Sequence, residues 1–569
     1  MRIKFLKDFQ PALFVSLKTY NKEKFLSDLM SGLIVGIVAL PLAIAFGISS
    51  GVAPEKGIVT AIIAGFLISL LGGSNFQIGG PTGAFIVIVY GIVEKFGVSG
   101  LAIATVLAGI MLLAMGFMKL GTVIKFIPYP IVVGFTSGIA LTIFSTQIKD
   151  IFGLSIDRVP SDFISKWQVY LSNFHTINGW AAAIGIISVV LIFLTPKMTR
   201  RIPGSLVAIV VMTVVVYFMR TQWGIEGIET IGDRFNIDNH LPAAEPIGFN
   251  LESIRLLFPS AFTIAMLGAI ESLLSAMVAD GATGDRHNSN MELVAQGVAN
   301  IVTPFFGGIP ATGAIARTMT NINNGGKTPV AGIIHAVVLL LILLFLGDLT
   351  RHIPMACLAG VLVVVAYNMS EWRIFVSLTK QSYSTLAILL TTFILTVVFD
   401  LTIAIEVGLL LAVFAFLKRM SESTQISVTT GKVDMSKELE SHSDHYEDEV
   451  LTLPKGVEVY EINGPFFFGV ANKFDELMRE IANKPNIRII RMRKVPFIDS
   501  TGLNNLETFC KNSRKEKITV ILSGVNDYVR TKLHKSDIPV IIGEENICSN
   551  IHLAVQRANE LTEQAKQDA

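Results

Sequence analysis

Runs of apolar residues long enough to cross a membrane dominate this chain. Between about residues 27 and 417 they follow one another with only short polar joints. About 20 largely apolar residues cross a bilayer as a helix, and helices and closed barrels are the structures that satisfy the backbone inside lipid. Charged residues make up 16% of the chain, whereas soluble proteins carry about 25%. The sequence therefore predicts a polytopic α-helical membrane protein.

The number and direction of the spans follow from these runs and from the basic residues beside them. Lys22 and Lys24 precede the first run, and Lys418 and Arg419 follow the last. Positive charge stays on the cytoplasmic side, so we expect both termini in the cytoplasm, an even number of spans and a location in the inner (cytoplasmic) membrane. We predict fourteen spans, several too short to cross alone, near residues 28–49, 56–72, 81–94, 99–118, 126–146, 179–195, 204–219, 256–279, 292–306, 314–323, 329–347, 354–368, 384–399 and 401–417.

Composition divides the chain into four parts. Phenylalanines and leucines are interleaved with lysines before the first span, which is typical of an interfacial amphipathic segment. After the last span, a polar stretch leads to β-branched runs at residues 457–462, 487–492 and 518–522, separated by helical patterns, as in a small α/β domain. The predicted parts are a cytoplasmic amphipathic N-terminus at 1–26, a transmembrane domain at 27–420, a linker at 421–449 and the α/β domain at 450–569.

A Gly- and Pro-broken phrase occurs once in each half of the chain. The first copy is Gly79-Gly80-Pro81-Thr82-Gly83-Ala84-Phe85, and the second, about 230 residues later, is Gly307-Gly308-Ile309-Pro310-Ala311-Thr312-Gly313-Ala314-Ile315-Ala316-Arg317. Such interruptions at corresponding positions of two halves mark the substrate site of a transporter built from repeats, and roughly seven spans per half would give the second copy inverted topology. The alternative is that Gly and Pro merely kink packed spans, where both are common.

The chemistry of the phrases favours an anion as the ligand. A helix that starts after Thr82 or Thr312 leaves its first N–H groups without partners, and these groups carry partial positive charge. The predicted anion-binding residues are Thr82, Gly83, Ala84, Phe85, Thr312, Gly313, Ala314, Ala316 and Arg317.

Arg317 is a lone positive charge in an apolar run, and the first phrase has Val87 at the matching position. An unpaired arginine at such a depth costs about 2.5 kcal/mol or more, which a bound anion would offset. The alternatives are an ion pair with Glu271 and a side chain that reaches to the interface.

Glu271 is a carboxylate inside the eighth predicted span, and Ser275 follows one turn later on the same face. Ionisable residues inside spans are functional candidates by default. Three roles stay open for Glu271: it takes up a coupling proton, it binds sodium together with Ser275 because hard cations favour oxygen, or it neutralises Arg317. The coupling ion is thus H⁺ or Na⁺, and we predict no other cofactor and no resident metal.

Several function classes lack their motifs in this sequence. We find no Walker motif for ATP-driven transport, and no nucleophile–base pair or metal-ligand cluster of an enzyme. Cys357, Cys510 and Cys548 have no disulfide or zinc spacing. Basic residues are scattered, so we expect no nucleic-acid partner.

Motifs in both the membrane part and the tail occur in the order of a known family. They are Ala39-Leu40-Pro41-Leu42-Ala43-Ile44-Ala45-Phe46, Gly79-Gly80-Pro81-Thr82-Gly83, Gly268-Ala269-Ile270-Glu271-Ser272-Leu273-Leu274-Ser275, Gly325-Gly326-Lys327-Thr328-Pro329 and Phe497-Ile498-Asp499-Ser500-Thr501-Gly502-Leu503. The membrane part resembles the SulP anion transporters, a family of sulfate and bicarbonate permeases, and the tail resembles the STAS domain.

This resemblance implies a fold and a site. The fold is two inverted seven-span repeats arranged as a core and a gate domain, in which two half-helices meet near mid-membrane, followed by a cytoplasmic STAS domain. A basic residue at the position of Arg317 lies by the anion in this family. The family often has a serine before it, where this chain has Ala316.

The resemblance also draws attention to Ser500 and Thr501. Anti-sigma-factor antagonists carry a phosphorylatable hydroxyl at this turn, and a phosphate there would sit favourably at a helix N-terminus. The alternative is that Ser500 or Asp499 simply caps the helix. We expect a regulatory protein at the STAS domain and a second copy of the chain, as a homodimer, to be partners.

These observations predict a secondary active transporter for a small inorganic anion, coupled to protons or sodium, with elevator-like alternating access. Sulfate is the first choice, and bicarbonate with sodium, or a dicarboxylate, follows. Rival functions are a membrane-anchored STAS signalling module and an anion channel. Intact Pro81, Thr82, Thr312 and Arg317 favour transport over signalling, and Glu271 favours coupled transport over a channel.

Overall fold

The computed structural model describes most of the chain. The described residues are 9–122, 128–156, 159–198, 203–225, 227–235, 240–399, 401–434, 450–470 and 485–567. Residues 1–8 of the predicted amphipathic N-terminus and 435–449 of the predicted linker lie outside them. Contacts divide the chain into two compact units, Met1–Leu411 and Ala412–Ala569, and each is described by itself.

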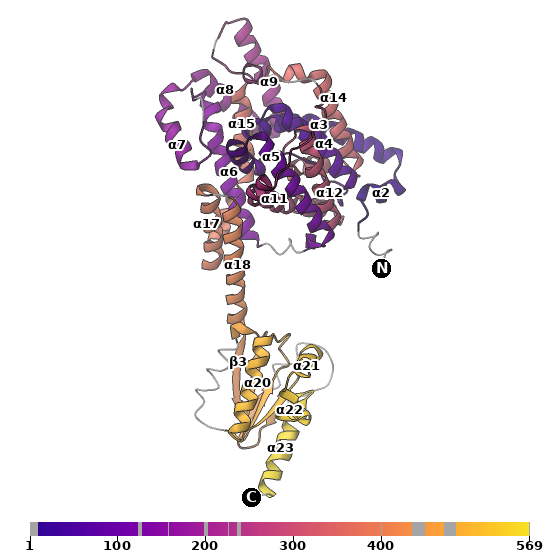
Figure 1. Cartoon of the computed structure of the whole chain (residues 1–569), viewed down its shortest axis with the longest axis vertical. Coiled ribbons are helices and arrows are strands. Elements are labelled where there is room, and N and C mark those ends of the chain that lie inside the picture. Colours follow the sequence, from indigo (N-terminus) through magenta and orange to yellow (C-terminus); the bar gives the residue numbers. More distant parts are fainter. Residues whose placement is uncertain are drawn as a thin grey trace. The chain divides into compact units, whose positions relative to one another are not determined.

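The first unit is built of helices joined by short connections (Figure 1). Nine helical segments of the described residues are long and apolar enough to cross a membrane. This confirms the predicted fold class, while the count of fourteen crossings stays a prediction. The helices at the predicted spans are α3 (Lys22–Ser49), α4 (Pro54–Leu71), α5 (Ile86–Phe117), α6 (Tyr129–Phe152), α8 (Gly179–Met198), α9 (Gly204–Thr221), α11 (Leu251–Thr283), α12 (Ser289–Val302), α13 (Ile315–Asn323), α14 (Val330–Thr350), α15 (Met355–Met369), α17 (Tyr383–Val398) and α18 (Leu401–Ser423).

Two features of the helices differ from the simplest expectation. α5 joins two predicted spans, and Gly97, with φ of 68°, breaks the helix between them, a conformation that glycine adopts readily. Short helices also occur outside the predicted spans. They are α2 (Ala12–Ser16), within the predicted amphipathic N-terminus, α7 (Phe163–Ser172), α10 (Ile231–Arg234) and α16 (Trp372–Thr379).

Helix packing sorts the first unit into two groups, and each combines helices from both halves of the chain. α3, α4, α5, α11, α12 and α14 pack on one another, and we call them the core bundle; α6, α8, α9, α15 and α17 form the gate bundle (Figure 1). Glycines allow close contact inside the core bundle: a Cβ on Gly109 of α5 would lie 2.7 Å from the carbonyl oxygen of Gly297 in α12. This sorting matches a fold of two repeats that each contribute core and gate helices.

The second unit comprises the end of α18 and the α/β domain that follows it. Its five strands have the order β3-β6-β7-β8-β9, with β3 antiparallel to β6 and the other pairs parallel. The elements are β3 (Gln425–Thr430), a ribbon of β4 (Lys432–Asp434) and β5 (Val450–Thr452), β6 (Val457–Asn463), β7 (Ile487–Arg491), α20 (Ser500–Lys515), β8 (Thr519–Ser523), α21 (Asp527–Leu533), α22 (Ile538–Ile542), β9 (Ile547–Cys548) and α23 (Ile551–Gln567).

The sheet of this domain is covered on both faces. All residues of the central strand β7 are buried, as parallel strands between two helical layers require. Residues of α20, α21 and α22 belong to one apolar cluster, and residues of α23 belong to the other (Figure 1). The predicted strands and the predicted α/β class are confirmed.

Candidate functional site

The two Gly- and Pro-broken phrases meet in the first unit. Their short strands β1 (Gly79–Gly80) and β2 (Thr312–Gly313) pair antiparallel, with Gly79 opposite Gly313. A Cβ on Gly313 would lie 1.7 Å from Nε2 of Gln77, so a larger residue at this crossing would have to displace the Gln77 side chain. The predicted proximity of the phrases is therefore present in the structure as a direct backbone pairing.

This pairing corrects the prediction that a helix starts directly after Thr312, because α13 begins only at Ile315. Thr312 and Gly313 belong to the pair, and ladder pairing holds its residues in an extended conformation, so α13 begins beyond them. In the first phrase Thr82 is extended, with φ of −129° and ψ of 160°, and a 3₁₀ turn at Gly83–Phe85 begins directly after it and leads into α5.

The start of α13 still offers backbone donors. Ala314 occupies its N-cap position, and no side chain caps the helix. The N–H of Ala314 donates to the carbonyl of Ile78 at 2.9 Å, so this one amide is not available to a ligand. The amides of the first helical turn lack intrahelical acceptors and carry the positive end of the helix dipole.

Arg317 lies in that first turn with 2% of its surface exposed. Its guanidinium donates to the carbonyl oxygens of Pro81 and Gly79, the latter at 3.4 Å. Both acceptors belong to the first phrase, so Arg317 ties the two phrases together. Within the described residues no carboxylate contacts Arg317 directly, but Glu271 lines the same cavity, so neutralisation of Arg317 by Glu271 stays a prediction.

The neighbouring hydroxyl groups are arranged in separate pairs. Thr82 Oγ1 donates to the Glu271 carboxylate at 2.8 Å, while Thr312 Oγ1 donates to the carbonyl of Gly268 at 2.9 Å. Ser275 Oγ donates to Thr318 Oγ1 at 3.1 Å. No hydrogen bond joins Glu271 to Ser275 among the residues described, and a sodium site made by this pair stays a prediction.

A cavity of about 450 Å³ lies where the two phrases face the gate bundle. The predicted residues that line it are Thr82, Gly83, Ala84, Glu271, Gly313, Ala314, Ala316 and Arg317. Phe85, Thr312 and Ser275 are buried and are not part of its lining. The structure thus brings most of the predicted residues to one cavity, and anion binding there stays a prediction.

Sequence reasoning missed the opposite wall of this cavity. Thr136 of α6, Asn368 of α15 and Glu371 line it from the gate side. Asn368 and Glu371 come at the end of a predicted span, where polar residues usually just mark the interface. A positive φ of 42° distinguishes Glu371, which is unusual for a residue other than glycine, but the sequence gives no signal of it.

A second cavity adjoins the first at Arg317. It has a volume of about 540 Å³, shares Ala316, Arg317 and Asn368 with the first cavity, and adds Lys197 from α8. Among the described residues that line it, Lys197 and Arg317 are the charged ones. The electrostatic field on this side of Arg317 therefore favours an anion.

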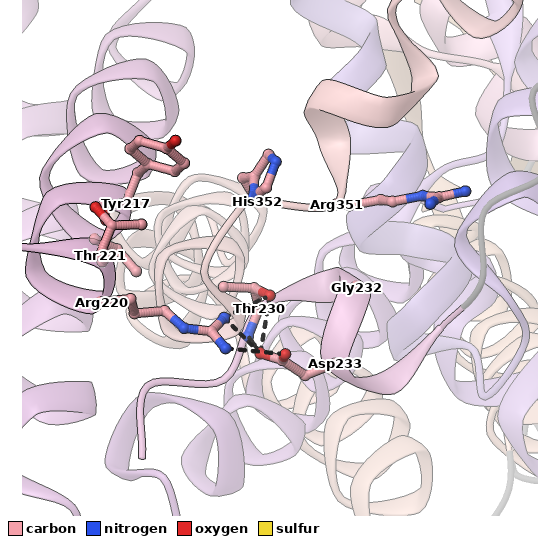
Figure 2. Close-up of a pocket in the computed structure, with 9 residues that line it drawn as sticks. Tyr217, Arg220, Thr221, Thr230, Gly232, Asp233, Arg351 and His352 are labelled. Atoms are coloured by element: carbon pink, nitrogen blue, oxygen red, sulfur yellow. Dashed lines mark hydrogen bonds and ion pairs between the residues drawn. The ribbon is translucent and has the colours of Figure 1, made fainter. Parts of the chain in front are cut away.

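Figure 2 shows a third cavity, of about 380 Å³, that provides a contrast. Here Arg220 points to Asp233, with N–O distances of 2.8 and 3.2 Å, and Thr230 also donates to Asp233. Arg351 extends away from this pair (Figure 2). Arg220 thus forms an ion pair with a carboxylate, whereas the hydrogen bonds of Arg317 go to backbone carbonyl oxygens.

The turn at the start of α20, where the STAS resemblance places a phosphorylatable hydroxyl, has an ordinary side-chain helix cap. Asp499 accepts hydrogen bonds from the N–H groups of Gly502 at 2.7 Å and Phe468 at 3.1 Å. Asp499 is therefore the helix cap, as one of the sequence alternatives states. Ser500 and Thr501 are exposed in the first turn of α20, and their phosphorylation stays a prediction.

Metal-binding and reactive-thiol chemistry find no support in the described part of the chain. No group of three or more His, Cys, Asp or Glu side chains there could hold a metal ion. Cys357, Cys510 and Cys548 are buried free thiols. Burial raises the pKa of the Cys510 thiol to about 12, which keeps it in the unreactive protonated form.

Comparison with known families and proteins accounts for nearly the whole chain. Residues 25–392 match the Sulfate permease family, and residues 450–558 match the STAS domain. The "Putative sulfate transporter YvdB" of Bacillus subtilis is 40% identical over 537 residues, which are 93% of this chain and 97% of that protein. The bicarbonate transporter BicA of Picosynechococcus is 30% identical over 519 residues, 89% of this chain and 90% of that protein.

Solved structures have the same fold. The murine Slc26a9 anion transporter in the inward-facing state matches with a TM-score of 0.86 at 19% identity, covering 98% of this chain and 95% of that one. The transmembrane domain of a cyanobacterial bicarbonate transporter, BicA, matches with a TM-score of 0.61 at 30% identity, covering 68% of this chain and 98% of that one. At 19% identity, the likeness to Slc26a9 concerns the fold alone.

Proposed function

The chain belongs to the sulfate permease family, whose members are transporters and not enzymes, and on that premise we propose that it moves sulfate across the membrane by secondary active transport. The observation that carries this proposal is Arg317. Its buried guanidinium reaches a cavity between two helix starts, and its described partners are neutral carbonyl groups.

A neutral carbonyl satisfies a donor but does not cancel a charge. The guanidinium has five N–H donors, and the described contacts of Arg317 use two of its nitrogens. A buried charge is stable only when it is paired. When Glu271, which lines the same cavity, is protonated, an oxyanion would provide the negative charge that Arg317 then lacks and further hydrogen-bond acceptors, with the amides at the start of α13 as additional donors.

Two observations favour sulfate over the other oxyanions: the positive charges beside the cavities, and the similarity of this chain to a protein named as a sulfate transporter. Arg317 and Lys197 line adjoining cavities, and a divalent anion gains more from two positive charges than a monovalent one. The relative named as a sulfate transporter shares more of its sequence with this chain than BicA does. Bicarbonate is the second candidate because BicA is also a relative, and a dicarboxylate is the third.

Glu271 is the residue that we propose for ion coupling. It lines the same cavity as Arg317 and accepts a hydrogen bond from Thr82 in the first phrase. When Glu271 is ionised it repels an anion, and when it is protonated this repulsion disappears, so proton and anion binding reinforce each other. Sodium is the alternative, because the same carboxylate can ligate a hard cation.

The elevator-like movement is supported by the way the core bundle and the gate bundle each provide one side of the cavity. The core bundle and its phrases provide Thr82, Glu271 and Arg317, while α6 and the end of α15 provide the opposite wall. Sliding of the core bundle along the gate bundle would carry the site between the two sides of the membrane without dismantling it.

We also propose that the protein is a homodimer in the inner membrane with cytoplasmic termini, and that a regulatory protein binds its STAS domain.

Uptake into proteoliposomes tests the transport proposal. We expect purified protein to accumulate labelled sulfate when a proton gradient is imposed, and unlabelled sulfate to compete better than bicarbonate. Sodium gradients and labelled bicarbonate provide the parallel measurements. Accumulation of bicarbonate but not sulfate would reject our substrate, and absence of uptake of any of these anions would reject the transport proposal.

Replacing the carboxylate of Glu271 tests the coupling proposal. Glu271→Gln has nearly the same shape and can still accept a hydrogen bond from Thr82, but it cannot ionise. We expect the variant to exchange sulfate across the membrane and to lose accumulation driven by the proton gradient, measured as the ratio of uptake with and without that gradient. An unchanged ratio would exclude Glu271 as the coupling residue.

A further inference from the structure

An apolar groove of about 510 Å³ lies on the gate bundle, apart from the cavities at Arg317. Its walls come from α6, α15, α16 and α17, and they are mainly aliphatic and aromatic. Phe144, Val376 and Leu390 in this lining have 37–43% of their surfaces exposed. Because α6 and α15 belong to segments of membrane-spanning length, the groove opens where hydrocarbon chains surround the protein.

The few polar groups of the groove satisfy one another. Ser137 Oγ donates to the carbonyl of Ser370 at 2.7 Å, and Ser370 Oγ donates to the carbonyl of Tyr367 at 2.7 Å. The indole N–H of Trp372 donates to the hydroxyl of Tyr367 at 3.3 Å. The groove therefore demands no hydrogen bonds from an occupant along its length, which favours a hydrocarbon chain over a polar ligand.

One end of the groove has the chemistry of a membrane–water interface. Tyr367 and Trp372 are about half exposed, at 49% and 48%, and amphipathic aromatic residues of this type settle at the level of lipid headgroups. Arg373 places its guanidinium 5.5 Å from the centre of the Trp372 ring. Within the described residues no carboxylate forms an ion pair with Arg373, and Lys380 follows the last residue of the same short helix, α16, as its C-cap.

From this combination we propose that the groove binds a membrane phospholipid with an anionic headgroup. One acyl chain lies between α6, α15 and α17, and the phosphate lies at Arg373. Each basic residue near a membrane surface attracts anionic lipid, and Arg373 adds this attraction at the mouth of a groove that already accepts hydrocarbon.

The groove and the cavity at Arg317 lie on opposite sides of one wall, which is formed by α6 and the end of α15. On α6, Thr136 lines the cavity and Ser137 lines the groove. After α15, Glu371 lines the cavity while Ser370 and Trp372 line the groove. The Ser137–Ser370 hydrogen bond fastens the two helices of this wall to each other. A bound lipid thus supports the wall that faces the candidate site, and the proposal does not depend on which anion is transported.

Quenching of Trp372 fluorescence by brominated lipids tests the proposal. Full-length protein is reconstituted in vesicles of neutral phosphatidylcholine that contain either brominated phosphatidylglycerol or brominated phosphatidylcholine at equal fractions. The difference between wild type and Trp372→Phe isolates the Trp372 signal. We expect brominated phosphatidylglycerol to be enriched at Trp372 by up to about fivefold over brominated phosphatidylcholine, the effect of one basic residue near a membrane surface.

Two variants with matched controls identify the headgroup and chain positions. Arg373→Gln should abolish the preference for the anionic lipid, whereas Lys22→Gln at the start of α3 should keep it. Leu390→Phe, which fills the exposed side of the groove, should weaken quenching by both lipids, whereas Leu410→Phe on α18 should not. The thermal midpoint of each variant checks that it is folded.

The remaining outcomes contradict the proposal. Equal quenching by both lipids, unaffected by Arg373→Gln, would mean that ordinary solvating lipid covers Trp372. Absence of quenching by either lipid would mean that protein, for example a second copy of the chain, covers the groove. Both results would overturn a specific phospholipid site, and neither would affect the proposed anion transport.

Discussion

Arg317 combines two roles that substitutions can separate. It donates to the backbone of the first phrase, and it brings a positive charge to the cavity. Arg317→Gln keeps donors without charge, and Arg317→Lys keeps the charge without the planar fork of donors. We expect Arg317→Gln to lower sulfate uptake at least about tenfold, because losing one partner of a buried charge contact costs about 2–5 kcal/mol, and Arg317→Lys to keep more activity. Equal uptake per reconstituted protein by wild type and Arg317→Gln would remove Arg317 from the site.

Lys166 is a buried lysine outside the membrane-spanning segments, in α7, with 2% of its surface exposed. Burial lowers the pKa of its ammonium group to about 8, although Glu94 and Asp162 oppose this shift. Between about pH 8 and the ordinary lysine pKa of 10.5, the folded protein therefore binds fewer protons than the unfolded chain. The free energy of unfolding then rises with pH across that window.

Lys166→Met removes this dependence while keeping much of the side-chain volume. We expect the variant to have the higher thermal midpoint near neutral pH, where wild type must bury an ammonium group. The difference between the two proteins should shrink as the pH rises toward 10, measured by thermal unfolding in detergent. A difference that is constant over this range would show that Lys166 has the same protonation state in the folded and unfolded chains.

Single residues could be predicted from the sequence where their chemistry contrasts with their surroundings. Arg317 and Glu271 interrupt apolar runs, and both line the cavity. Asn368 and Glu371 could not be found, because polar residues at the end of a span are ordinary. The pairing of Ser275 with Thr318 also depends on how α11 and α13 pack, which helical periodicity does not reveal.

At the scale of elements, the crossing of β1 and β2 positions the whole candidate site. Gly80 has φ of 148°, and a Cβ there would lie 2.4 Å from Nη1 of Arg317. Gly80→Ala would therefore strain the backbone and displace the guanidinium. We expect a loss of sulfate uptake of about tenfold or more with a thermal midpoint lowered by a few degrees, since a strained residue costs about 1–3 kcal/mol.

Gly91 provides the matched control for this substitution. It lies in α5, and a Cβ there would have no atom within 4 Å. Gly91→Ala should leave uptake unchanged and slightly favour the helix, because alanine loses less backbone freedom on folding than glycine. If Gly80→Ala transported as well as Gly91→Ala, the close approach of Arg317 to the first phrase would not matter for function.

The sequence predicted which segments are helical better than it predicted the residues at which the helices begin. Apolar runs locate the spans because burial in lipid selects composition over a whole helix. The start of α13 depends instead on the pairing of Gly79–Gly80 with Thr312–Gly313, which is a contact between residues far apart in sequence. Backbone pairing between two short Gly-containing phrases has no periodicity, so only the inverted arrangement of the repeats hinted that they would meet.

At the scale of the whole molecule, α18 connects the two units, and its end packs within the second. Leu417 and Met420 contact the apolar cluster of the α/β domain, and Ser421 Oγ donates to the carbonyl of Gly469 at 2.5 Å. The contact division after Leu411 assigns this end of the helix to the second unit, whereas the sequence places the end of the transmembrane domain at residue 420.

Deleting the residues after Ser421 tests what the second unit contributes. The deletion leaves Leu417 and Met420 without their apolar partners, and burial of such a side chain contributes about 1.5–3 kcal/mol. We expect several-fold less folded protein and lower uptake, while the preference for sulfate over bicarbonate stays as in wild type, because the cavity at Arg317 is lined by the first unit. The measurement is uptake of both anions per amount of folded protein.

A full-length variant separates the loss of the domain from the exposure of α18. Met420→Gln weakens the contact of α18 with the apolar cluster but retains the domain, so it should lower the amount of folded protein less than the deletion does and leave the choice of anion unchanged. If instead the deletion changed the ratio of sulfate to bicarbonate uptake and Met420→Gln did not, the domain itself would take part in selecting the anion. The cavity at Arg317 would then not suffice to explain which anion is transported.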